Sequence, residues 1–265
     1  MDPCIYSLIS TYVPEHFTVL TELADGFLIK ETRDGNTFAN GVRHSFNDEP
    51  LFCTDDSIAW YKHGKLHRDN DLPALIWNDG TEEWWQNGKR HRDNDLPAVI
   101  WKNNRKKWWY KNGFIHRDND LPAVVGPDNV QEWYQNGKLF RINGPTVIWA
   151  DGTQVWYKNC RIHRDNDLPA MIQPNGTRAW YSHGKLHRDN DLPATILNNG
   201  TEMWFQNGKE HRDNDLPAIV QLDGHKEWFR RGYRHRDNDL PALICVNGAR
   251  TWFLHGEYKK FQKGP

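Results

Sequence analysis

The residues with the clearest chemical potential are concentrated in one octapeptide, His-Arg-Asp-Asn-Asp-Leu-Pro-Ala, which occurs in seven identical copies. It places an imidazole, a guanidinium and two carboxylates within five positions. Guanidinium groups stacked along such a ladder could bind a periodic anionic partner, such as phosphoinositide headgroups or a polysaccharide. The candidate ligand ladder comprises His67, Arg68, His91, Arg92, His116, Arg117, His163, Arg164, His187, Arg188, His211, Arg212, His235 and Arg236.

The same residues could instead satisfy one another. Each Arg can pair with an Asp of its own or of the adjacent copy, and Asp and Asn side chains can cap a turn through hydrogen bonds to backbone N–H groups. A specific binding site needs few copies, so identical repetition favours this structural interpretation.

Metal and catalytic interpretations of the octapeptide are weaker. Calcium takes about 6–8 oxygen ligands, commonly from an acidic loop closed by a Glu, whereas Arg68 adjoins Asp69 and no Glu closes the loop. Histidines of successive copies would stand about 10 Å apart, too far to share a zinc ion. His-Arg-Asp also occurs in the kinase catalytic loop, but no Gly-rich loop or Asp-Phe-Gly accompanies it.

A repeat distributes its chemistry evenly, whereas an active site is one asymmetric cluster. We therefore expect no catalytic residue, no metal, no cofactor and no enzymatic activity. The irregular positions are the degenerate copy at residues 140–146, Cys160 in place of a repeat Gly, and the N-terminal segment. We therefore expect residues that recognise a specific partner to lie at these irregular positions.

A second periodic set is a column of Trp residues, each followed by Tyr, Trp or Phe. Such rings could stack sugars or unpaired bases on an open face. Their regular placement favours packing, in which cross-strand aromatic pairs stabilise a sheet. The column comprises Trp60, Trp84, Trp109, Trp133, Trp156, Trp180, Trp204, Trp228 and Trp252.

The elements that must position these residues follow from the repeat, whose copies begin 23 to 25 residues apart. Most Trp of the column lie between two Gly turns, such as Asp79-Gly80 and Asn87-Gly88. Asn-Gly and Asp-Gly favour two-residue type I′ hairpins. The sequence thus predicts a mainly β fold, an elongated single-sheet antiparallel meander of about nine hairpin repeats.

A two-residue loop at Asp79-Gly80 would pair Leu75 with Trp84 and Ala74 with Trp85. Pro73 has no N–H group for the ladder, so it belongs at a strand start or a break. We expect the Asp-Asn-Asp-Leu stretch to kink the return strand.

Residues 1–26 lack the repeat. Apolar residues follow helical spacing from Ile5 to Val13, and Pro14 could open a second helix that ends at Gly26. Repeat arrays commonly need caps. The predicted organisation is a short helical cap at 1–26 and a β-repeat array at 27–265.

Composition narrows the partners. The 34 basic and 35 acidic residues give a net charge of -1, so we expect no nucleic-acid partner. Mean hydropathy is -0.88, and no segment has the length of a transmembrane helix. The four Cys share no metal spacing and are expected to be reduced thiols in a cytoplasmic protein.

The run Trp84-x-x-Asn87-Gly88-Lys89-x-His91, with Asp79-Gly80 upstream, resembles the MORN repeat. The resemblance extends from about Asp34 to the C-terminus, and it departs at Arg92 and Asn94, where the MORN pattern has Gly. The His-Arg…Pro-Ala variant is similar to MORN-repeat proteins of large DNA viruses of amoebae. Some of those carry an F-box-like N-terminal segment, of which residues 1–23 look like a shortened version.

The resemblance implies an array of MORN-like hairpins in a host cytoplasm or a virion. It also implies scaffolding, self-association or, in some arrays, lipid binding. Our first hypothesis is a non-enzymatic protein that binds protein partners, or its own copies through terminal edges such as the strand near Thr251–Leu254. Phosphoinositide or polysaccharide binding along the ladder is the alternative, and membrane lipid is the less favoured partner. An F-box-like ubiquitin-ligase adaptor is the third hypothesis.

Overall fold

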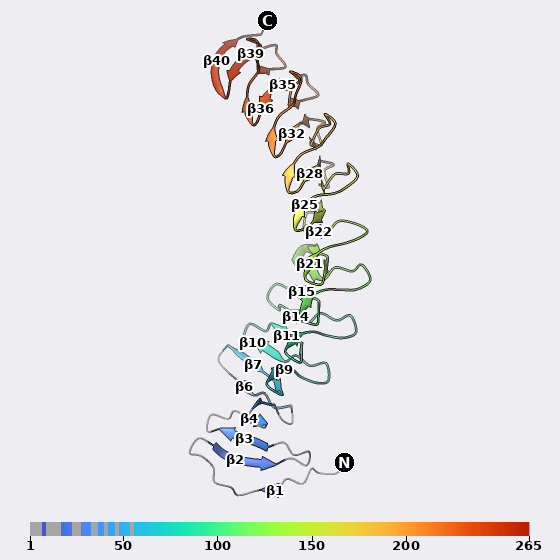
Figure 1. Ribbon diagram of the computed structural model, residues 1–265, viewed down its shortest axis with the longest axis vertical. Coiled ribbons are helices and arrows are strands. Elements are labelled where there is room, and N and C mark those ends of the chain that lie inside the picture. The colour runs from blue at the N-terminus through green and yellow to red at the C-terminus, as the bar shows by residue number, and fades with distance from the viewer. Residues whose placement is uncertain are drawn as a thin grey trace. The chain divides into compact units, whose positions relative to one another are not determined.

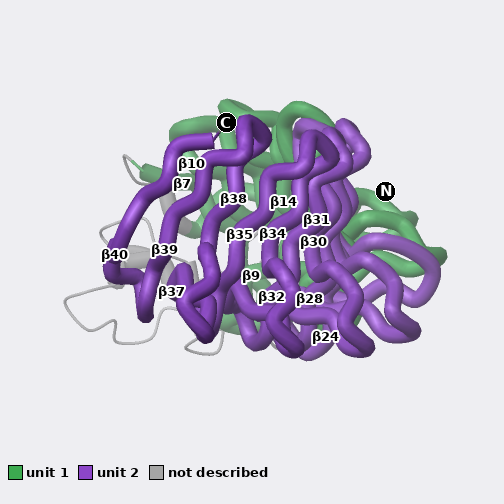
Figure 2. Tube along the Cα trace, turned by 90° about the horizontal axis from the view of Figure 1, so that it is seen from above, with its two compact units in different colours: residues 1–138 green, residues 139–265 purple. Residues whose placement is uncertain are grey.

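The computed structural model describes residues 7–8, 17–22, 28–32, 37–39, 42–45, 48–53 and 56–264. The chain forms two compact units, residues 1–138 and 139–265, which Figure 2 colours green and purple. Both units are built from short antiparallel strands joined by tight turns (Figure 1). The prediction of a mainly β antiparallel meander of hairpins is confirmed.

The first unit begins with a five-stranded sheet in sequence order. Its strands are β1 (Ser7–Leu8), β2 (Phe17–Glu22), β3 (Leu28–Thr32), β4 (Thr37–Ala39) and β5 (Val42–Arg43). A second antiparallel sheet follows, whose strands in order are β6 (Phe52–Cys53), β7 (Ser57–Ala59), β10 (Leu75–Trp77), β11 (Glu82–Glu83), β14 (Val99–Ile100), β15 (Lys107–Trp108), β18 (Val124–Val125) and β19 (Gln131–Glu132). One short 3-10 helix, η1 (Pro127–Asn129), lies between β18 and β19.

Each repeat of the first unit adds a separate two-stranded hairpin. These hairpins are β8 (Tyr61–Lys62) with β9 (Lys65–Leu66), β12 (Trp85–Gln86) with β13 (Lys89–Arg90), and β16 (Tyr110–Lys111) with β17 (Phe114–Ile115). The strands β20 (Tyr134–Gln135) and β21 (Lys138–Leu139) follow where the two units meet in the sequence.

The second unit continues the pattern. Its sheet runs in the order β22 (Val147–Ile148), β23 (Gln154–Val155), β26 (Met171–Ile172), β27 (Arg178–Ala179), β30 (Thr195–Ile196), β31 (Glu202–Met203), β34 (Ile219–Val220), β35 (Lys226–Glu227), β38 (Leu243–Ile244), β39 (Arg250–Leu254) and β40 (Glu257–Gln262). Its separate hairpins are β24 (Tyr157–Lys158) with β25 (Arg161–Ile162), β28 (Tyr181–Ser182) with β29 (Lys185–Leu186), β32 (Phe205–Gln206) with β33 (Lys209–Glu210), and β36 (Phe229–Arg230) with β37 (Tyr233–Arg234).

The predicted register at Asp79-Gly80 is wrong by one residue. Leu75 pairs with Glu83 and not with Trp84. Among the loop residues only Gly80 has a positive φ, of 81°, whereas a type I′ turn needs two such residues. The loop therefore holds three residues, with Gly80 in the left-handed position, and the Asp79 carboxylate accepts the Thr81 N–H at 2.7 Å.

The Asn87-Gly88 turn forms as predicted. Both residues have positive φ, 51° and 78°, and Gln86 pairs with Lys89 across the two-residue loop. The octapeptide also breaks the return strand where the sequence predicts a kink. Asn94 and Asp95 both adopt the left-handed conformation, so the loop separates β13 from β14.

The predicted helical cap meets described residues at two places. Ser7–Leu8 and Phe17–Glu22 are antiparallel strands, so the helical interpretation is wrong for these residues. Thr18, Val19 and Thr21 are β-branched and favour a strand, which apolar spacing alone does not reveal. The remainder of the predicted cap, including most of the F-box-like segment, lies outside the described residues.

The core of both units includes the octapeptide Ala and most of the column Trp, together with sheet residues such as Val99, Val124 and Val155. The Ala of every identical copy has no exposed surface: Ala74, Ala98, Ala123, Ala170, Ala194, Ala218 and Ala242. Each Trp of the column lies where the chain passes from the sheet into a separate hairpin, except Trp252, which lies within β39. The octapeptide loop is thus anchored next to the Trp column.

Candidate functional site

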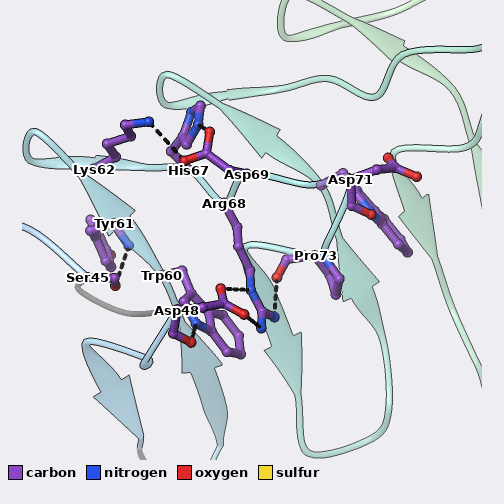
Figure 3. Close-up of polar contacts among 11 residues, drawn as sticks. Ser45, Asp48, Trp60, Tyr61, Lys62, His67, Arg68, Asp69, Asp71 and Pro73 are labelled. Atoms are coloured by element: carbon purple, nitrogen blue, oxygen red, sulfur yellow. Dashed lines mark hydrogen bonds and ion pairs between the residues drawn. The ribbon is translucent and has the colours of Figure 1, made fainter. Parts of the chain in front are cut away.

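The Arg of the octapeptide is held by three kinds of contact, illustrated by Arg68 in Figure 3. Its guanidinium carbon lies 3.7 Å from the centre of the Trp60 ring. Its Nε and Nη2 atoms each donate to the Asp48 carboxylate at 2.7 Å. Its Nη1 atom donates to the Pro73 carbonyl of its own copy at 3.2 Å. A planar fork of this kind matches both oxygens of a carboxylate.

The carboxylate in each pair belongs to the preceding copy. The same two-point pairing, at 2.7–2.8 Å, joins Arg92 to Asp71, Arg117 to Asp95, Arg188 to Asp167, Arg212 to Asp191, and Arg236 to Asp215. The Asp also holds the Trp, because the Trp84 indole N–H donates to the Asp71 carbonyl at 3.0 Å. The Arg of one copy therefore contacts both the Trp and the Asp of the copy before it, and we call this pair of contacts the clamp.

The His of the octapeptide makes a second link. The Nδ1 atom of His67 accepts the backbone N–H of Asn87 at 3.0 Å, so it binds the next hairpin turn along the chain. Its Nε2 atom lies 2.9 Å from the Asp69 carboxylate, which also accepts from Lys62. With Nδ1 as the acceptor, the imidazole proton belongs on Nε2, where it is donated to Asp69.

These contacts lower the pKa of the Asp carboxyl groups. The hydrogen bonds from Arg212 hold the pKa of Asp191 below its ordinary value of 3.8. A hydrogen bond from Lys62, and then one from His67, lower the pKa of Asp69. Each carboxylate thus stabilises the folded state as long as it stays ionised.

The ladder residues therefore face one another, and each guanidinium covers an indole ring. Seven Trp of the column are only 5% to 8% exposed, which leaves no ring face open for a stacked ligand at these positions: Trp60, Trp84, Trp109, Trp133, Trp180, Trp204 and Trp228. Successive octapeptides line shallow clefts between them, for example His187 to Asp191 against His211 to Asn214. Among the residues that the structure describes, no three His, Cys, Asp or Glu side chains are placed to hold a metal ion.

A buried carboxylate was not identified from the sequence. The Glu83 side chain is 6% exposed and accepts hydrogen bonds from Trp77 Nε1 at 3.0 Å and from Trp85 Nε1 and Arg90 Nε at 2.9 Å each. Glu227 occupies the same position before its column Trp and pairs with Arg234 at 2.7 Å. The signal in the sequence was an acidic residue directly before a Trp and seven residues before an Arg.

The irregular positions differ in the structure as well. Cys160 is exposed, is not disulfide-bonded and adopts a φ of 59°, which the Gly of the other copies adopts without cost. Cys245 is also a free thiol. In the degenerate copy, Phe140 and Ile142 are 45% and 73% exposed. The repeat thus presents its least regular surface within residues 140–164.

Comparison with models of known protein families and with curated proteins finds no match for this chain. The resemblance to MORN repeats therefore remains a prediction that rests on the motif residues. Within the described part of the chain, no helix is both long and apolar enough to cross a membrane.

Proposed function

We propose that this chain is a non-enzymatic, MORN-like repeat protein that acts as a protein–protein interaction module or structural scaffold. The observation that carries the proposal is the closure of the ladder, by which we mean that its Arg and His side chains bind groups of this chain itself. Six of the seven octapeptide Arg forks are occupied by the Asp of the preceding copy, Arg164 being the exception, and each octapeptide His is bound by an Asp and a turn N–H, as at Arg188 and His187. The repeated chemistry is thus used to join one copy to the next.

Closure of the ladder disfavours a ligand that runs along all copies. A phosphoinositide or polyanionic polysaccharide would have to displace two charge-assisted hydrogen bonds at each Arg that it binds. Such displacement would also uncover the Trp beneath the guanidinium, which lies 3.7 Å below Arg212 in the case of Trp204. Contacts with a partner are better supplied by surfaces that the repeat leaves open.

The terminal strand β40 is one such surface. It pairs with β39 along one side, and no other described strand of residues 139–265 pairs with its second side. Its residues are all exposed, including Tyr258 at 62% and Phe261 at 57%. Lys259 and Lys260, which could repel a second strand, are paired with Glu257 and Asp239. An unpaired edge with apolar side chains invites strand addition.

We expect the chain to self-associate through β40, and size-exclusion chromatography with light scattering measures this directly. Tyr258→Lys combined with Phe261→Lys should convert the associated form to monomer, because it places like charges opposite each other across the paired edges. Leu222→Lys is the matched control, since Leu222 is 82% exposed but lies outside β40. A wild-type chain that stays monomeric at high concentration would contradict self-association through this edge.

A further inference from the structure

The degenerate copy at residues 140–146 removes one carboxylate from the ladder. The first degenerate copy keeps its Asp, because Asp48 receives the fork of Arg68. In the second, Gly144 stands at the position of that Asp, and the loop is one residue shorter. The octapeptide Arg of the following copy is Arg164. Its Nη1 atom still donates to the Pro169 carbonyl at 3.2 Å, but its Nε and Nη2 atoms have no partner among the described residues.

The rest of the Arg164 site is assembled like the others. The guanidinium carbon lies 3.9 Å from the centre of the Trp156 ring, within the 3.7–4.0 Å of the intact copies. The degenerate copy is folded, because the buried Thr146 hydroxyl donates to the Val155 carbonyl at 3.2 Å. Arg164 therefore presents a pre-formed fork whose usual ligand is missing. Burial without a compensating anion lowers the pKa of Arg164.

A second donor is vacant at the same place. In the intact copies the column indole N–H donates to the carbonyl of the missing Asp, as Trp180 does to Asp167 at 3.0 Å. Trp156 Nε1 makes no such bond within the described part of the chain, and Trp156 is more exposed than the seven column Trp that are 5% to 8% exposed. Three N–H donors around one stacked guanidinium and indole are therefore free to bind an acceptor from outside the repeat.

We propose that Arg164 and Trp156 form a binding site for a carboxylate side chain of an acidic segment in a partner protein. The inference rests on the proposed function, since the segment belongs to a protein partner. The Asp carboxylates of the six occupied forks define the expected geometry, with one oxygen on Nε and the other on Nη2. The exposed Phe140 and Ile142 lie in the same degenerate copy and offer apolar contacts beside the charge.

The chemistry favours a carboxylate over a phosphate. The occupied forks hold a planar carboxylate against a guanidinium that is itself stacked on an indole. Lys158, the nearby cation of the hairpin, is already paired with Asp165 at 2.8 Å, whereas Arg164 has no carboxylate partner among the described residues. A phosphate dianion is usually bound by several cations or a row of backbone N–H groups. One monovalent carboxylate matches one unpaired Arg.

Titration of the full chain with an N-acetylated hexaglutamate amide tests this site. Calorimetry gives the stoichiometry, and the indole N–H resonance of Trp156 reports the location. We expect one site per chain, with Arg164→Gln weakening binding by roughly 10- to 100-fold, because a charged hydrogen-bonded pair is lost. Arg188→Gln is the matched control, since the Arg188 fork is filled by Asp167, and it should leave the affinity unchanged.

Two further variants keep the test independent of the stability of Arg164→Gln. Asp191→Ala empties the fork of Arg212 while the backbone carbonyl that binds Trp204 remains, and it should raise the stoichiometry from one to two. Replacement of residues 142–144 by the tetrapeptide Asp-Asn-Asp-Leu restores the carboxylate, and it should abolish binding.

Absence of peptide binding, binding that survives Arg164→Gln, or binding of inorganic phosphate in place of the peptide would each overturn the inference. The result is separate from self-association through β40. If the chain associates through β40 but does not bind the peptide, the proposed function stands and the Arg164 site is ruled out. If the chain binds the peptide at Arg164 but remains monomeric, the Arg164 site stands and self-association through β40 is ruled out.

Discussion

Replacement of Trp204 by Ala is expected to lower the free energy of unfolding by about 3–5 kcal/mol. Trp204 is 7% exposed, so the substitution leaves a cavity between the sheet and the octapeptide loop. It also removes the surface on which Arg212 stacks and the donor to the Asp191 carbonyl. One substitution thus removes the packing of one copy and its clamp to the next.

Trp156→Ala provides the matched control, because Trp156 is more exposed and its indole N–H has no partner among the described residues. We expect it to cost less than Trp204→Ala, while Trp204→Phe should fall between the two. Urea denaturation followed by circular dichroism measures all three. Equal losses for Trp204→Ala and Trp156→Ala would show that the column stabilises the fold through generic apolar burial and not through the clamp.

Replacement of Glu83 by Met is expected to cost about 2–4 kcal/mol of unfolding free energy. The Glu83 carboxylate lies buried and receives donors from Trp77, Trp85 and Arg90. Met has a similar volume but no acceptor of comparable strength, so two indole N–H groups and a guanidinium lose their partner. Because Arg90 is 37% exposed and can reach water, the cost should stay below that of a fully buried unpaired charge.

Another repeat of the chain provides the control for this prediction, because it has no carboxylate at the position that corresponds to Glu83. Met203 stands at the corresponding position before Trp204, and its surroundings carry Leu197, Phe205 and Glu210 in place of the three donors. Met203→Leu should therefore cost less than about 1.5 kcal/mol, the usual range for a volume-conserving exchange. If Glu83→Met proved as mild as Met203→Leu in the same denaturation experiment, the Glu83 network would not be a stabilising element.

The local chemistry of turns explains which parts of the fold could be predicted. Asn87-Gly88 forms its type I′ turn because both residues tolerate positive φ. Asp79-Gly80 has the same signature, yet the loop takes in Asn78 as well, and Leu75 pairs with Glu83. The dipeptide marks the place of a turn but does not fix the loop length, so a register error of one residue follows directly.

The pairing of the ladder was less accessible to sequence analysis. Arg and Asp residues within a copy are closer in sequence than those of adjacent copies, so both pairings remained open. The structure shows Arg212 paired with Asp191 of the preceding copy, because the octapeptide loops stand side by side. Glu83 was missed for a related reason. Beside Glu82 it resembles a solvated charge, and only the placement of Trp77, Trp85 and Arg90 around it reveals a buried acceptor.

The most direct test of ladder closure is a double-mutant cycle between Arg212→Ala and Asp191→Ala, measured at pH 7 and again at pH 2.5. Because Asp191 is 47% exposed, we expect a coupling energy of only about 0.5–1 kcal/mol at pH 7. The pKa of Asp191 is lowered on folding, so its contribution is present above pH 3.8 and disappears as the pH falls through the folded pKa. The coupling should therefore be weaker at pH 2.5 than at pH 7. Coupling that is zero at pH 7, or that is undiminished at pH 2.5, would contradict the closure of each copy onto the one before it.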